Sequence, residues 1–167
     1  MTYRTSVLVP ERSTVFIEGS SSLHPLHAKA TGAEGRVEAS VTKTGVRIRA
    51  GGIRVPVSLL RSGNPLVDRE TRRRIDANAF PEISGTLTAA TPTGPGALAA
   101  AGELTFRGET RPVTGALDVV AEDDGLHITG RARFDVRDWG LDLPRLGLLK
   151  VHPDIVVSID LWAVPEP

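Results

Sequence analysis

Every second residue from Leu126 to Val136 is apolar or small, without a break. Only an extended strand sorts its side chains with a period of two, so that the two sets face opposite sides. Asp124-Gly125 immediately precedes this run, and residues that tolerate a positive φ are typical of tight hairpin turns. Because residues 113–119 alternate in the same way, we predict a β-hairpin with one apolar and one polar face.

Similar apolar or alternating runs recur along the whole chain. They cover residues 14–18, 26–31, 36–42, 46–49, 53–59, 83–87, 98–106, 113–120, 126–136 and 155–161. Within the run at 53–59, Pro56 lacks a ladder donor and predicts an edge strand or a bend, and residues 92–96 are interpreted as a loop. Alternation on nearly every strand favours closure of the sheet, because a closed sheet has no unpaired edges. We therefore predict one all-β domain over residues 1–167, an antiparallel β-barrel of about eight strands.

This alternation also predicts which side chains face the barrel interior. The residues predicted to point inward are Leu104, Phe106, Leu117, Val119, Ile128, Phe134, Ile155, Val157 and Ile159. The residues predicted to point outward are Asp118, Arg131, Arg133 and Asp160. A shift by one residue would exchange these two sets, so the prediction tests the register directly.

One short helix is predicted in the middle of the chain, beginning at Asn64-Pro65 and ended by Phe80-Pro81. Asn64 offers a helix cap, and proline is tolerated in the first turn. The apolar positions Leu66, Ile75 and Ala79 form only a thin stripe, which is typical of a helix on the surface.

Charge and composition exclude several classes of function. Twenty basic residues balance twenty acidic ones and aromatic residues are scarce, so no nucleic-acid partner is expected. The chain has no cysteine, which excludes thiolate chemistry and disulfides. The first residues lack the apolar region of a signal peptide, and no later run is long enough for an integral membrane segment, so we expect a cytoplasmic protein.

Small residues recur at positions predicted to face the interior. They are Gly85, Ala100, Gly102, Gly115, Gly130 and Ala132. A barrel of about eight strands is wide enough to be filled by side chains or to hold one slim ligand. The small residues therefore indicate either a cavity or close strand packing, and the sequence leaves both open.

Three motifs in the chain carry a resemblance to a known family. Residues 80–87 read FPEISGTL, residues 102–113 read GELTFRGETRPV, and Asp138-Trp139-Gly140-Leu141 follows. This order resembles the YceI-like family, with its strand "YP-x-I", its hairpin "G-x-LT-x-RG-x-T-x-PV" and its aspartate-aromatic-glycine turn. The segment from Gly19 to Pro25 is similar to the variant opening of some members. The resemblance implies a lipocalin-like antiparallel β-barrel, often a homodimer, whose apolar cavity binds a polyisoprenoid or another long-chain lipid.

Other residues raise alternative kinds of chemistry. His24 and His27 lie three positions apart, which places them on opposite faces of a strand, so we expect neither a metal site nor another cofactor. The segment Gly19 to His24 lacks the G-x-S-x-G elbow of serine hydrolases. Three carboxylates gather near the turn at Trp139. They are Asp135, Asp138 and Asp142. Their two possible roles are capping of the turn and acid–base catalysis.

A basic run on the predicted helix is the most suggestive polar feature. It consists of Arg69, Arg72, Arg73 and Arg74. Guanidinium groups match the geometry of an anionic head group such as a pyrophosphate. The alternative is a solvated helix face, in which Asp68, Glu70 and Asp76 neutralise the arginines at helical spacing.

The expected function is binding, sequestration or transport of a long-chain apolar ligand inside the barrel. The alternatives are an enzyme that acts on such a lipid through the Asp138 region or His24, and a structural barrel without a ligand. The large apolar residues predicted to line or gate the cavity are Phe16, Phe80, Leu87, Phe106, Phe134, Trp139 and Leu148.

Overall fold

The computed structural model describes residues 2–141 and 150–167. Its strands are β1 (Arg4–Leu8), β2 (Thr14–Ser20), β3 (Pro25–Thr31), β4 (Glu34–Thr42), β5 (Gly45–Pro56), β6 (Glu82–Gly94), β7 (Ala97–Phe106), β8 (Glu109–Glu122), β9 (Gly125–Asp135) and β10 (Asp154–Pro165). Its helices are α1 (Pro65–Ile75) and the 3₁₀ helices η1 (Pro10–Arg12), η2 (Val57–Leu59) and η3 (Val136–Trp139).

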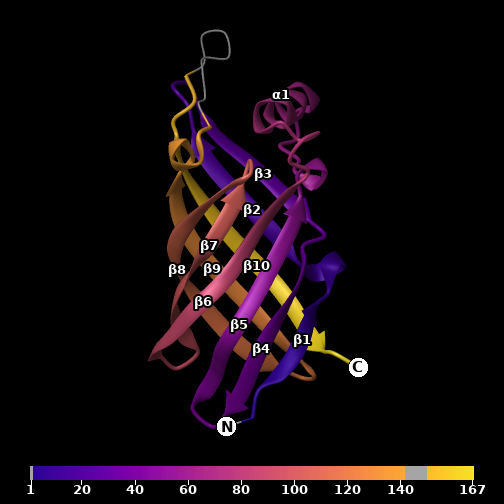
Figure 1. The fold of residues 1–167 in the computed structure, drawn as a ribbon, viewed down its shortest axis with the longest axis vertical. Coiled ribbons are helices and arrows are strands. Elements are labelled where there is room, and N and C mark those ends of the chain that lie inside the picture. Colours follow the sequence, from indigo (N-terminus) through magenta and orange to yellow (C-terminus); the bar gives the residue numbers. More distant parts are fainter. Residues whose placement is uncertain (1, 142–149) are drawn as a thin grey trace.

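The strands form one antiparallel sheet that closes into a barrel (Figure 1). From β4 to β10, all neighbours in the sheet are also consecutive strands of the chain, as is usual for antiparallel sheets. The ring closes because β10 pairs with β1, while the β2–β3 hairpin extends from the other half of β10. The predicted all-β barrel with one short helix is confirmed.

The change of partner along β10 takes place at Trp162, and a buried serine satisfies the backbone there. Asp160 is the last β10 residue opposite β2, and Ala163 is the first opposite β1. Between them, the Trp162 N–H donates to Ser13 Oγ at 3.3 Å, and the Trp162 carbonyl accepts from Val9 N at 2.8 Å. Ser13 is completely buried, so water does not reach the backbone N–H of Trp162, and the Ser13 hydroxyl accepts its hydrogen bond instead.

The predicted register is confirmed. All nine apolar side chains predicted to point inward belong to the hydrophobic core or pack against it. Asp118, Arg131, Arg133 and Asp160 are exposed. In the β8–β9 pair, Val119 lies opposite Ile128 and Leu117 lies opposite Gly130, so each pair shares the interior face.

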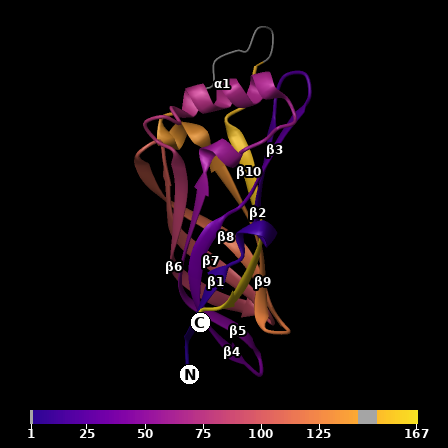
Figure 2. The same ribbon diagram turned by 90° about the vertical axis from the view of Figure 1, so that its right-hand side faces the viewer.

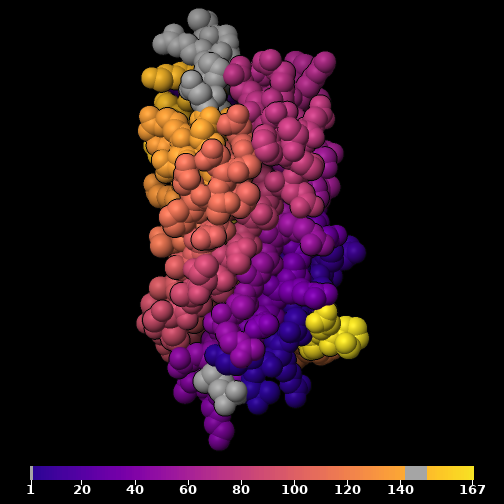
Figure 3. Space-filling view, viewed as in Figure 1, coloured from indigo at the N-terminus to yellow at the C-terminus, as the bar shows by residue number. Residues whose placement is uncertain are grey.

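The barrel interior differs along its length. At the end where the termini lie (Figure 1), residues near the β6–β7 and β8–β9 turns, such as Leu98, Val119 and Ala163, are buried and fill the barrel. In the middle, inward-facing residues such as Val157 are only partly buried, although they point to the interior. At the opposite end α1 lies across the barrel (Figure 2). On the face shown in Figure 3, the strand side chains pack into a continuous surface.

Two local predictions are wrong in detail, and a third is correct only in part. Of the two alternatives for Pro56, the edge strand is wrong, because β5 lies between β4 and β6; Pro56 is instead the last residue of β5, where the chain leaves the strand and enters η2. The predicted loop at 92–96 is mostly strand, since β6 continues to Gly94 and only Pro95 and Gly96 form the turn. In the β8–β9 turn the positive φ belongs to Asp123, at 48°, rather than to Gly125.

Gly125 is instead required by close packing. A Cβ atom at this position would lie 2.5 Å from Cζ2 of the Trp162 ring. Glycine at the start of β9 therefore allows the ring of Trp162 to lie directly over the backbone.

Replacing Ser13 by alanine tests the junction at Trp162. We expect S13A to lower the free energy of unfolding by about 1–3 kcal/mol, because a buried N–H loses its acceptor. S158A is the matched control, since the Ser158 hydroxyl makes no hydrogen bond within the described residues. Urea unfolding measures both variants, and equal losses would contradict this role of Ser13.

Candidate functional site

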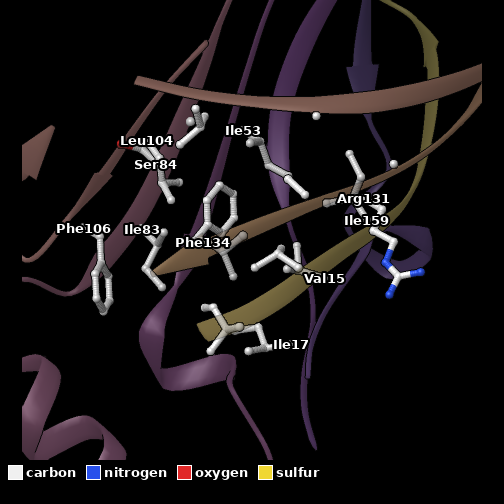
Figure 4. A pocket seen from close by; sticks show the side chains of 18 of the residues that line it. Val15, Ile17, Ile53, Ile83, Ser84, Leu104, Phe106, Arg131, Phe134 and Ile159 are labelled. Carbon is white, nitrogen blue, oxygen red and sulfur yellow. The ribbon is translucent and has the colours of Figure 1, made fainter. Parts of the chain in front are cut away.

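A cavity of about 500 Å³ occupies the middle of the barrel. Its wall is almost entirely apolar and is formed by residues of all ten strands, of α1 and of η3. Figure 4 shows Ile17, Ile53 and Phe134 gathered around this space, whereas the guanidinium group of Arg131 points away from it. Packed protein interiors contain few voids larger than a water molecule, so a cavity of this size is a specific feature of the molecule.

The cavity explains why many inward-facing residues are only partly buried. Ile17, Ile53 and Val157 line it, and each retains accessible surface toward the interior. Ile48, Ile128 and similar residues are buried where the cavity meets the packed end of the barrel. The barrel is therefore filled at one end and hollow in its middle.

Four of the predicted ligand-binding residues line the cavity. They are Leu87, Phe106, Phe134 and Trp139. These side chains come from β6, β7, β9 and η3, which the closed sheet brings around one space. Contact between them and a ligand stays a prediction.

Two other predicted residues lie elsewhere. Phe16 is 37% exposed on the outer face of β2, because its neighbours Val15 and Ile17 take the inward positions of the alternating strand. Phe80 does not line the cavity; its ring packs over Gly108, where a Cβ atom would lie 2.7 Å from Cε1. Leu148 lies outside the described residues.

Helix α1 supplies a row of three cavity residues, of which the sequence analysis singled out only Ile75. Its N-terminus is capped by Asn64, whose Oδ1 accepts from Leu66 N at 3.0 Å and from Val67 N at 3.4 Å. Val67, Thr71 and Ile75, spaced four residues apart on one helical face, line the cavity. Their i, i+4, i+8 spacing is the signal that could have found this face.

The stripe of apolar residues predicted for the helix is corrected accordingly. Ile75 is buried and faces the cavity, as the stripe requires. Leu66, however, is 76% exposed, and Ala79 lies beyond the end of α1. The helix therefore covers the end of the barrel with a different face from the predicted one.

Trp139 closes the same end of the barrel from the other side. It is buried, its Nε1–H donates to the carbonyl of Leu104 at 2.9 Å, and its ring meets that of Phe134 edge-on, with centroids 5.7 Å apart. Gly140, at φ 74°, ends η3 directly after it. Trp139 is thus both a buried core residue and part of the wall of the cavity.

Two arginines of the β7–β8 hairpin hold the backbone around Trp139. Arg107 Nη1 donates to the carbonyl of Gly140 at 2.6 Å, and Arg111 Nε donates to the carbonyl of Asp138 at 3.0 Å. The hairpin motif and the Asp138-Trp139-Gly140 turn, 27 to 35 residues apart in the chain, are therefore one structural unit.

The structure divides the basic run of α1. Arg73 and Arg74 both form ion pairs with Glu70, at 2.8 Å each, which agrees with the interpretation as a solvated helix face. The hydrogen bond from Arg73, helped by Arg74, holds the pKa of Glu70 below its ordinary value. Arg72 instead lines the cavity, where it makes no ion pair with another described residue.

The small inward-facing residues serve close packing as well as the cavity. All six border the cavity. A Cβ atom at Gly102 would lie 2.3 Å from the Thr86 carbonyl oxygen, and one at Gly130 would lie 2.6 Å from Leu117 Cδ2. The two interpretations left open by the sequence therefore apply together, because these glycines bring strands close and also bound the space.

Candidate catalytic groups do not converge on the cavity. Among the described residues, Asp138 and His24 do not line it, and the Asp135 carboxylate is engaged by Arg137, which lowers the pKa of that carboxyl. Asp142 lies outside the described residues. His24 and His27 belong to no cluster of three metal-ligating side chains in residues 2–141 and 150–167.

His152 is the one of the four histidines that could join a serine near the cavity. It lines the cavity, and its Nδ1 lies 2.9 Å from Ser20 Oγ. A serine nucleophile needs a base that a third group orients, and no hydrogen bond joins the other ring nitrogen of His152 to a described carboxylate.

Comparisons with known proteins agree on the fold. The YceI-like domain model matches residues 7–163. The structure of BcnA from Burkholderia cenocepacia superimposes with a TM-score of 0.82 at 14% identity, covering 94% of this chain and 99% of that one. A polyisoprenoid binding domain from Saccharophagus degradans gives 0.74 at 11% identity, covering 99% and 100%. A YceI protein from Campylobacter jejuni gives 0.69 at 10% identity, covering 84% of each chain.

Two further observations concern curated relatives and membrane-spanning helices. The sequence has no significant match among curated proteins. No helix within residues 2–141 and 150–167 has the length and apolar character needed to cross a bilayer.

The bond between Trp139 and Leu104 can be tested by a paired substitution. We expect Trp139→Phe to lower the free energy of unfolding by about 1–3 kcal/mol, because a buried carbonyl loses its donor and the smaller ring leaves space. Trp162→Phe is the control, since the indole N–H of Trp162 has no partner among the described residues. A loss in W162F as large as that in W139F, measured by urea unfolding, would argue against this role.

Proposed function

Because the chain belongs to the YceI-like domain family, we propose that it binds a long-chain apolar ligand, a polyisoprenoid or a similar lipid, inside its barrel. The observation that carries the proposal is the hollow, apolar middle of the barrel between a packed end and the end covered by α1. Its volume of about 500 Å³ lies in the range of small-molecule sites. The polyisoprenoid binding domain from Saccharophagus degradans, which shares the fold, supports the same ligand class.

The binding energy comes from removing the hydrocarbon tail from water. Each buried CH₂ group contributes about 0.8 kcal/mol, which corresponds to roughly fourfold in affinity. This contribution has no preferred direction, so the cavity selects for the length and width of the tail. The activity proposed here is carriage of a lipid rather than its chemical conversion.

A prenol series tests this proposal. We expect the affinity to rise from geraniol to farnesol and geranylgeraniol, because each isoprene unit buries further apolar surface until the cavity is full. Competition with a fluorescent polyprenyl probe measures the dissociation constants. Failure of the protein to bind any of these prenols at micromolar concentrations would overturn the proposal.

Two valine substitutions on β10 locate the site. Val157 faces the cavity, whereas Val156 lies on the other face of the same strand, opposite Glu18 and Arg133. Val157→Phe fills space that the tail needs, and we expect it to weaken geranylgeraniol binding by about tenfold or more, the equivalent of about two lost CH₂ groups. Val156→Phe leaves the affinity unchanged.

The same pair separates a hollow barrel from a filled one. In a hollow barrel, Val157→Phe leaves the melting temperature close to that of the wild type. In a filled barrel it overpacks the core, at a cost of about 1–3 kcal/mol in the free energy of unfolding. A structural barrel without a ligand would therefore show a large drop in the melting temperature of V157F, and neither the wild type nor the variant would bind geranylgeraniol.

A further inference from the structure

Four polar side chains of the cavity gather at one end of it, while Ser84 of β6 and His152 line it elsewhere along the chain. Ser62, Asp68, Thr71 and Arg72 line this end, and all four belong to α1 or to the segment just before it. Polar strand residues along the cavity wall, such as Arg131, are exposed and extend outward. A ligand that fits this distribution has an apolar tail and one polar end, with the polar end beside α1.

A polar recess adjoins the cavity at this end. It is bounded by Ser58, Arg61, Pro65, Asp68 and Arg72, which belong to η2, to the segment that follows it, and to α1. Asp68 and Arg72 line both the recess and the cavity, so the two spaces are neighbours. The recess differs from the cavity in that most of its lining residues carry polar or charged side chains.

The backbone of Arg61 is fixed in place at the edge of this recess. Arg61 and Lys29 of β3 form a pair of backbone hydrogen bonds, each 2.9 Å long. One nitrogen of the Arg61 guanidinium, Nη1, donates to the carbonyls of Ser58 and Leu60. These bonds hold the guanidinium next to the recess, and its other N–H groups make no hydrogen bond with a described residue.

The charges around the recess do not cancel. Arg61 and Arg72 carry two positive charges, and the buried carboxylate of Asp68 carries one negative charge, which leaves one positive charge in excess. Asp68 Oδ1 accepts from the backbone N–H of Ser62 at 2.8 Å. The neighbouring Arg73 and Arg74 are matched to Glu70, so Arg72 is the arginine of this run that faces the recess without an ion pair among the described residues.

We propose that the ligand carries an anionic head group, a carboxylate or a phosphate monoester, held in the polar recess between Arg61 and Arg72 while its tail fills the cavity. Guanidinium groups present paired donors that match the oxygens of both head groups. The single excess positive charge suits a head group with one or two negative charges. This inference rests on the proposed function, since it concerns the polar end of the same ligand.

Three ligands with the same tail and different head groups test the inference. They are geranylgeraniol, geranylgeranoic acid and geranylgeranyl phosphate, each measured by displacement of the fluorescent polyprenyl probe. We expect both anions to bind at least about tenfold more tightly than the alcohol, and their order tells a carboxylate site from a phosphate site. Raising the salt concentration should reduce this preference while leaving the alcohol unchanged.

Substitutions then assign the preference to the recess. We expect Arg72→Gln and Arg61→Gln each to reduce the preference for the anions over geranylgeraniol by about tenfold, a change of about 1.4 kcal/mol. Arg73→Gln is the matched control, because Arg73 lies on the same helix but is paired with Glu70 outside the recess. An unchanged melting temperature shows that each variant is folded.

The outcomes separate this inference from the function on which it rests. Tight binding of the alcohol with no preference for either anion would overturn the anionic head group and leave the apolar carrier intact. A preference that persists in both R72Q and R61Q would overturn the assignment to the recess. Failure of all three ligands to bind would overturn the proposed function, and this inference with it.

Discussion

The hydrogen bonding of β10 to two different partners is the interaction on which the rest of the structure depends. Toward the end with the termini β10 pairs with β1, and toward the α1 end it pairs with β2. The bridge between Lys29 and Arg61 joins β3 to the segment after β5, so β2 and β3 take the wall positions that β1 and β4 hold at the other end. The buried hydroxyl of Ser13 satisfies the backbone where the partners change.

Closure of the ring allows the two ends of the barrel to be built differently. One end is filled by buried side chains, whereas the other is covered by α1 and by Trp139, which the β7–β8 hairpin holds in place. The cavity between these two ends has an almost entirely apolar wall. Such a wall offers too few hydrogen-bond partners to hold water molecules stably. An apolar tail with a polar end beside α1 satisfies both parts of this interior.

Strand periodicity is a local property, and it predicts the faces of β8, β9 and β10 residue by residue. It also places Phe16 outside, since Val15 and Ile17 take the inward positions, whereas ring size alone suggests a cavity residue. The role of α1 depends on which end of the barrel it crosses, and that is decided by contacts between distant segments. For the same reason, the sequence identifies Arg72 as part of a basic run but does not show that it lies beside Arg61 at the recess. The homodimer and the cytoplasmic location stay predictions.

Native mass spectrometry of freshly purified protein tests the central claim most directly. If the hollow barrel carries a lipid, the spectrum shows the polypeptide with a bound molecule, and extraction into organic solvent releases a compound with a long apolar tail. The extracted protein then regains a single bound molecule when geranylgeraniol or geranylgeranoic acid is added. The mass of the polypeptide alone, both as purified and after incubation with these lipids, would contradict the account.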